Sequence, residues 1–145
     1  MKILTKTNDQ LLNIAVLLLR LTIGVILFGA GAGKLFKWFG GFGLEMTVHY
    51  FAEMGFSAPL AYLSTFTEFI GGILLIVGLL TRPAAFAVLI NMTVATVVSL
   101  PKGFFVGMAA YPFALAIVAL VILLTGPMAY SIDALFQKEP KLVRN

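Results

Sequence analysis

The sequence predicts an all-α fold: an integral membrane four-helix bundle with a short amphipathic interfacial helix between its first two spans. Of the 145 residues, 61% are hydrophobic and 11% are charged, whereas a soluble domain is about half apolar and about a quarter charged. A chain of this length could not bury so much apolar surface inside itself, because small domains keep much of their surface exposed. The apolar residues also form runs of roughly 20, the length that crosses a bilayer. We therefore expect residues 1–145 to form a single transmembrane domain in the lipid bilayer.

The first predicted span covers residues 11–33, LLNIAVLLLRLTIGVILFGAGAG. This run is longer than the apolar core of a signal peptide and carries Arg20 in its middle, so we expect a retained helix. Its end is similar to a phosphate-binding loop, which reads G-x-x-x-x-G-K-[ST]. Phe28 occupies the position of the first glycine and Leu35 follows the lysine, so the segment is interpreted as the outer end of a membrane helix.

The connection after this span contains the predicted interfacial helix, LEMTVHYFAEM. Glu45, His49 and Glu53 recur every fourth residue and form one polar stripe. A second stripe, suited to the lipid interface, consists of Met46, Tyr50 and Met54. Histidine and glutamate at this spacing can bind a divalent metal. With one histidine and no cysteine in the chain, a solvated face is favoured, and we predict no metal site.

The remaining spans are predicted at residues 59–80, 83–100 and 106–126. Pro83 suits the first position of a helix. Breaks between and after the spans are indicated by Pro101 with Gly103 and by Gly126 with Pro127.

Four spans place both termini on the same side of the membrane. The basic residues on that side are Lys2, Lys6, Arg82, Lys138, Lys141 and Arg144. Those on the opposite side are Lys34, Lys37 and Lys102. The positive-inside rule therefore predicts that both termini are cytoplasmic. This distribution leaves no basic face, so the net charge of +4 does not predict a nucleic-acid partner.

Three polar residues lie inside the apolar spans: Arg20, Glu68 and Asn91. A charged side chain at the centre of a span costs roughly 2.5–3.5 kcal/mol and normally pairs inside the bundle. Counted from the cytoplasmic ends of their spans, their depths are about 13, 18 and 12 Å at a rise of about 1.5 Å per residue. We therefore predict that Arg20 pairs with Glu68 and that Asn91 completes the polar layer.

This polar layer has a structural and a functional interpretation. An ion pair and an amide could fix the register of the helices, although desolvation consumes most of the Coulomb energy of a buried pair. Ionisable residues inside a membrane also mark binding sites and proton relays, here for a quinone head or an oxoanion. The sequence leaves both interpretations open.

Glycines share helix faces with these polar residues. Arg20, Gly24, Gly31 and Lys34 lie on one face of the first span, with Lys34 at the outer mouth of the polar centre. Gly29 and Gly33 form a small-xxx-small step, a pattern typical of close helix contacts. The glycines predicted to pack helices are Gly24, Gly29, Gly31, Gly33, Gly71 and Gly72.

No redox group is evident in the chain itself. It has no cysteine and a single histidine, which excludes thiol relays, thiolate clusters and haem ligation by a histidine pair within one chain. The sequence contains no recognisable pairing of a catalytic nucleophile with a base. Electrons would have to come from a bound quinone or from a partner.

Three pieces of the chain occur in a fixed order: RLTIGVILFGAGAGKLF, GFSAPLAYLSTFTEFIGGILLIVGLLTRPAAF and LLTGPMAYSID. Together they resemble the DoxX/DoxD-like family of small four-helix membrane proteins, over about residues 17–136. The sequence departs from that pattern at Met128, where a second glycine is common, and at Tyr111–Pro112, where an acidic residue is often seen.

The resemblance implies a bacterial inner-membrane protein of redox chemistry, either an oxidoreductase component or a quinone-interacting partner subunit. Arg20 would orient a carbonyl or oxoanion, Glu68 would balance charge or carry a proton, and Asn91 would support them. Whether the chain itself catalyses a reaction stays open. The alternatives are a non-enzymatic scaffold, assembly factor or chaperone-like partner, and a small-solute carrier. A redox protein and a second copy of the chain are the expected protein partners.

Overall fold

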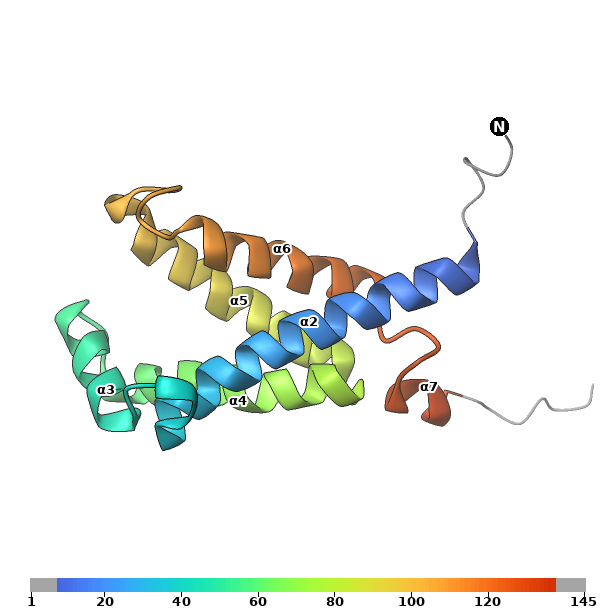
Figure 1. Ribbon diagram of the computed structural model, residues 1–145, viewed down its shortest axis with the longest axis horizontal. Coiled ribbons are helices and arrows are strands. Elements are labelled where there is room, and N and C mark those ends of the chain that lie inside the picture. Colours follow the sequence, from blue (N-terminus) through green and yellow to red (C-terminus); the bar gives the residue numbers. More distant parts are fainter. Residues whose placement is uncertain (1–7, 138–145) are drawn as a thin grey trace, which may run out of the picture.

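The computed structural model describes residues 8–137, and this part of the chain is all helical, without a strand (Figure 1). The helices, in order, are α2 (Asp9–Phe36), η1 (Trp38–Gly40), α3 (Leu44–Glu53), α4 (Ala58–Val77), α5 (Thr81–Ser99), η2 (Leu100–Lys102), α6 (Ala110–Thr125) and α7 (Ile132–Phe136). Five basic residues of the topology prediction lie outside the described residues: Lys2, Lys6, Lys138, Lys141 and Arg144.

Helix α2 is longer than the predicted first span because its ends are capped beyond the apolar run. The side chain of Asn8 accepts a hydrogen bond from the backbone N–H of Gln10 at the first turn. At the other end, Lys37 adopts a left-handed conformation and its N–H bonds to the carbonyl of Gly33. The 28 residues between these caps extend over about 42 Å, more than the roughly 30 Å of a bilayer core.

Helices α2 and α4 and the segment Thr81–Lys102 are long and apolar enough to cross a membrane. Gly78, with φ of +71°, ends α4 before the predicted boundary at residue 80. The fourth predicted span, 106–126, is a shorter helix of 16 residues, because α6 begins only at Ala110 after a loop in which Met108 has a positive φ. The structure therefore confirms an all-helical protein with three candidate membrane helices, and α6 is a shorter apolar helix.

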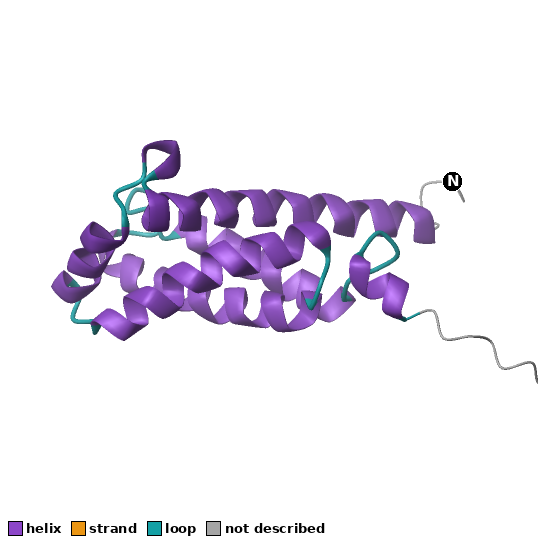
Figure 2. Cartoon of the chain, turned by 90° about the horizontal axis from the view of Figure 1, so that it is seen from below, coloured by secondary structure: helices purple, strands orange, loops and turns teal. Residues whose placement is uncertain are grey.

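Helices α2, α4, α5 and α6 share one hydrophobic core. Helix α2 lies along α4, α5 lies along α6, and the two pairs meet through α4 with α5 and α2 with α6 (Figures 1 and 2). The core residues that are fully buried are Ile23, Leu27, Leu75, Ala85, Val88, Ala119 and Ile122. This apolar core separates the two ends of the molecule.

Glycines bring α2 and α4 into close contact, as the sequence predicts for part of its glycine set. A Cβ atom at Gly31 would lie 2.5 Å from the backbone nitrogen of Phe69, and one at Gly72 would lie 2.5 Å from that of Phe28. Gly24 also packs against α4, because a Cβ atom at this position would lie 2.9 Å from the carbonyl oxygen of Gly72. No larger residue fits at these positions without moving the helices.

The other predicted packing glycines have different surroundings. Gly71 faces Val88 of α5, and Gly33 lies against Gly41 of the following loop instead of another helix. A Cβ at Gly29 would meet no atom within 4 Å, so the structure lacks the predicted helix contact there.

Helix α3 lies at one end of the molecule and α7 at the opposite end (Figures 1 and 2). Helix α3 contacts α2 and α4, and its existence confirms a short helix between the first two spans. We call these two ends the α3 end and the α7 end.

Candidate functional site

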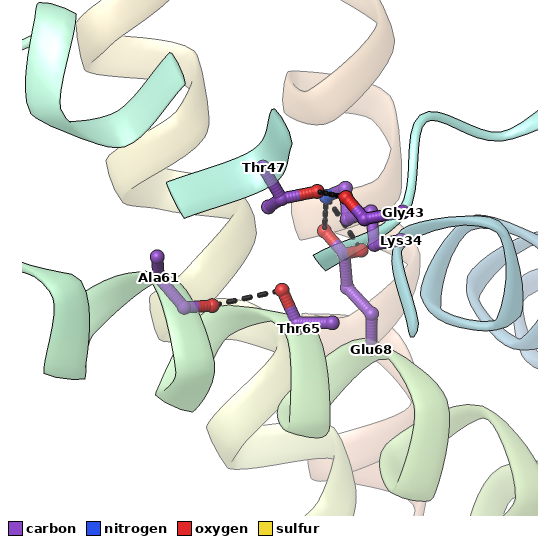
Figure 3. A network of polar contacts seen from close by, with 6 residues as sticks. All are labelled: Lys34, Gly43, Thr47, Ala61, Thr65 and Glu68. Atoms are coloured by element: carbon purple, nitrogen blue, oxygen red, sulfur yellow. Dashed lines mark hydrogen bonds and ion pairs between the residues drawn. The ribbon is translucent and has the colours of Figure 1, made fainter. Parts of the chain in front are cut away.

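Lys34 and Glu68 form an ion pair near the α3 end (Figure 3). The Lys34 Nζ atom lies 2.8 Å from Oε1 and 2.7 Å from Oε2 of Glu68. The Glu68 side chain is only 7% exposed, whereas that of Lys34 is 30% exposed. The predicted pairing of Glu68 with Arg20 is therefore wrong, because Lys34 occupies both carboxylate oxygens.

The close crossing of α2 and α4 explains this pairing. Gly31 lies against the backbone of Phe69. Lys34, three residues after Gly31, therefore meets Glu68, the residue before Phe69. Lys34 lies in the last turn of α2, from where its long side chain can reach back along the helix. The sequence already placed Lys34 and Gly31 on one face.

Arg20 lies far from this pair and is bound by backbone carbonyls. It is 1% exposed. Its Nε donates to the carbonyl of Leu75 at 3.1 Å, and its Nη1 donates to those of Pro127 and Tyr130 at 2.8 and 2.9 Å. The depth calculation failed because it assumed that the spans end level, whereas α2 runs past the end of α4. Arg20 therefore joins α2 to α4 and to the segment before α7.

Asp133 of α7 also binds backbone groups at this end of the molecule, and it lines a cavity of about 530 Å³ there. Its two carboxylate oxygens accept the backbone N–H groups of Leu80 and Thr81, at 2.9 and 2.8 Å, and its own N–H donates to the carbonyl of Gly78. Partial burial would raise the pKa of Asp133, but the hydrogen bonds from Thr81 and Leu80 and the charge of Arg20 together hold that pKa below its usual value. Sequence reasoning missed this residue, although it ends the S-I-D piece. We call Arg20, Asp133 and the backbone groups that they bind the α7 lock.

A cleft of about 460 Å³ lies between α4 and α5 and contains the Lys34–Glu68 pair in its wall. Asn91 of α5 lines it as well, so three of the four predicted polar-centre residues share one cavity, and Arg20 does not. Its apolar walls consist of Phe51, Met54, Phe56, Leu60, Leu63, Ala87, Ile90, Val94, Ala95 and Val98. Three polar residues of the cleft that sequence reasoning missed are Ser64, Thr67 and Ser99.

The loop candidates lie outside this cleft. His49 Nε2 is 3.2 Å from Glu53 Oε1, and both side chains are more than half exposed. Glu45 is exposed on the same helix. Within residues 8–137, no three histidine, cysteine or acidic side chains are grouped so as to hold a metal ion.

Comparison with known proteins gives one family and one relative. A family model described as DoxX matches residues 15–108. A protein of Bacillus subtilis (strain 168) with the name "Putative oxidoreductase CatD" is 30% identical over 129 residues, which cover 89% of this chain and 92% of that protein. No solved structure matches the chain. The matched region includes Lys34, Glu68 and Asn91, whereas Asp133 lies beyond the family model.

Proposed function

Because the chain belongs to the DoxX family, we propose that it serves membrane redox chemistry by binding a quinone in the cleft between α4 and α5. The observation that carries this proposal is an ion pair with a buried carboxylate in the wall of a mostly apolar cleft of about 460 Å³. Pockets of this kind, with apolar walls and few polar groups, typically bind small molecules. The oxidoreductase name of the Bacillus relative supports the redox class.

The ion pair favours a neutral carbonyl over an oxoanion. An ammonium group has three N–H donors, and the two contacts of Lys34 to Glu68 leave one donor for a ligand. Since Glu68 balances the positive charge, an anion would gain little attraction and would be repelled by the carboxylate. Arg20, the other candidate for an oxoanion, already binds three carbonyl groups. In this proposal Lys34 therefore takes over the role expected of Arg20, and Glu68 holds it in place.

The walls of the cleft suit the rest of a quinone. Phe51 and Phe56 offer aromatic surface to a flat ring. Leu63 and Ile90, which are exposed on the outer surfaces of α4 and α5, line the cleft as well. An apolar tail can therefore pass from the cleft into the surrounding lipid. Asn91, on the wall formed by α5, would donate to a second carbonyl.

Electron transfer through this site needs a partner. The chain has no cysteine and one histidine, so we propose that a separate redox protein exchanges electrons with the bound quinone. The chain would then act as a subunit in the bacterial inner membrane with cytoplasmic termini, as the charge distribution predicts.

Quinone titration of the purified protein in lipid nanodiscs tests the proposal. Wild type should bind a short-tailed ubiquinone saturably. Lys34→Met should weaken binding by about tenfold or more, because a charge-assisted hydrogen bond contributes about 1.5–3 kcal/mol. Glu68→Gln should weaken binding as well, since Lys34 loses its partner. Matched controls are Lys102→Met and Glu53→Gln, which alter exposed residues outside the cleft and should bind like wild type.

One observation favours the alternative of a scaffold or assembly factor. The α7 lock is a purely structural use of a buried arginine, and the Lys34–Glu68 pair could serve the same purpose. If wild type binds no quinone while Glu68→Gln fails to assemble in the membrane, the redox proposal is wrong and the scaffold is supported.

A further inference from the structure

The cleft carries a row of polar side chains that leads from the α3 end to Glu68. On α4, Thr67 and Glu68 follow Ser64 by three and four residues, so the three side chains share one face. On α5, Asn91 and Ser99 lie eight residues apart, two turns along one face. Both rows line the same cavity from opposite walls.

These side chains differ from Thr65, Thr93 and Thr96 of the same helices, whereas Thr81 at the start of α5 also lacks a partner for its hydroxyl. The hydroxyls of Thr65 and Thr96 donate to the carbonyl four residues earlier in their own helix. In the described part of the chain, no such bond forms at Ser64, Thr67 or Ser99, and the Asn91 amide has no protein partner either. A polar group inside a membrane protein needs a hydrogen-bond partner, and water is a partner that fits several groups along one cleft.

The two ends of this row have opposite surroundings. Ser99 is the last residue of α5 and Ser64 lies about 9 Å beyond the start of α4 at the α3 end. Beyond Glu68, toward the α7 end, Leu75 and Val88 are fully buried. A second cavity, of about 530 Å³, lies at the α7 end and is lined by Thr81 and Asp133, on the other side of these buried residues from Glu68. The fully buried core therefore separates Glu68 from the cavity at the α7 end, whereas the cleft connects Glu68 with the α3 end.

We infer that the cleft is a hydrated half-channel that begins at the α3 end and ends at the Lys34–Glu68 pair, and through which water and protons reach that pair from one side of the membrane. This inference rests on the proposed function only for the use of those protons, because quinone reduction consumes two protons for two electrons. With cytoplasmic termini, the channel would open on the outer side. The α3 end and the termini would then lie on opposite sides.

The absence of cysteine from the chain allows a direct test. Ser64→Cys and Asn91→Cys are made singly and exposed to a charged, membrane-impermeant methanethiosulfonate in right-side-out and inside-out vesicles. Thr93→Cys is the matched control, because Thr93 lies two residues from Asn91 on α5 but does not line the cleft. The side that holds the termini is located separately by protease access to a C-terminal tag.

We expect both cleft cysteines to react at least about tenfold faster than the control, because a thiol in apolar surroundings stays protonated and unreactive. The reaction should occur from the side opposite the termini only. Equal labelling from both sides would overturn the inference and favour a carrier, and labelling no faster than Thr93→Cys would show a lipid-filled cleft. The conservative Ser64→Cys change keeps the test valid if Asn91→Cys fails to fold.

Addition of a short-tailed ubiquinone separates this inference from the proposed function. Protection of Ser64→Cys from the reagent supports both. Fast one-sided labelling without protection keeps the half-channel and contradicts quinone binding in the cleft. Saturable quinone binding with slow labelling contradicts the half-channel alone.

Discussion

Lys34 and Glu68 join the last turn of α2 to the middle of α4 through two contacts of 2.7 and 2.8 Å, across 34 residues of sequence. The carboxylate is buried, whereas the ammonium group remains partly accessible from the cleft. In the proposed quinone site this pair would have a role in stability and a role in ligand binding. Measurements of folding that need no ligand separate the two roles.

Removal of one partner of this pair should destabilise the protein more than removal of both. A single Lys34→Met change leaves the buried Glu68 charge unpaired and should cost about 3–5 kcal/mol, whereas Lys34→Met with Glu68→Met leaves no buried charge. Unfolding of the single and double variants in detergent, analysed as a double-mutant cycle, measures the coupling. A double variant less stable than Lys34→Met alone would contradict this pairing.

Arg20→Leu should be among the most destabilising single changes. It leaves the carbonyls of Leu75, Pro127 and Tyr130 without their donor, and an unsatisfied buried polar group costs about 1–3 kcal/mol. The matched control is Arg82→Leu, because Arg82 is exposed. Comparison of the two melting temperatures decides the point, and equal temperatures would show that the α7 lock contributes little.

Substitution of two glycines in α2 should give opposite results. Gly31→Ala places a methyl group 2.5 Å from a backbone atom of α4, and such overpacking typically costs about 1–3 kcal/mol. Gly29→Ala has open space around it and should be neutral or stabilise the helix by up to about 1 kcal/mol. Chemical denaturation of both variants tests the pair, and a destabilising Gly29→Ala would place that residue in a contact that the structure lacks.

The contribution of Asp133 should depend on pH. Because folding lowers its pKa from the ordinary value of 3.8, the carboxylate stabilises the fold above that value. The stabilisation is lost as the pH falls through the lower pKa of the folded state. At pH 7, Asp133→Asn should lose about 0.5–2 kcal/mol, as is typical of a lost helix cap.

Melting temperatures of wild type and Asp133→Asn, measured from about pH 7 to about pH 3, test this dependence. The difference between the two proteins should shrink as the solution becomes more acidic. A difference that is constant over this range would show that the charge of Asp133 has no part in the cap.

Much of the fold could be predicted from local sequence. Long apolar runs must become helices in lipid, since each backbone N–H and C=O then finds a partner within its own segment. The amphipathic spacing of residues 44–54 gave α3, and the face shared by Gly31 and Lys34 identified the surface that meets α4. The observed helix ends differ from the predicted ones where the backbone conformation of a single residue ends the helix. One example is Gly78, whose left-handed φ of +71° ends α4.

The partners of the buried charges depended on the tertiary structure. Composition and spacing determined that Arg20, Lys34, Glu68 and Asn91 stand out in an apolar chain, but they predicted a shared polar centre that includes Arg20, whereas only Lys34, Glu68 and Asn91 line one cleft. Only the offset between α2 and α4 decided that Glu68 meets Lys34 and that Arg20 meets the segment before α7. Helical spacing places residues on a face, but the relative height of two packed helices follows from where their closest contacts form, here Gly24, Gly31 and Gly72.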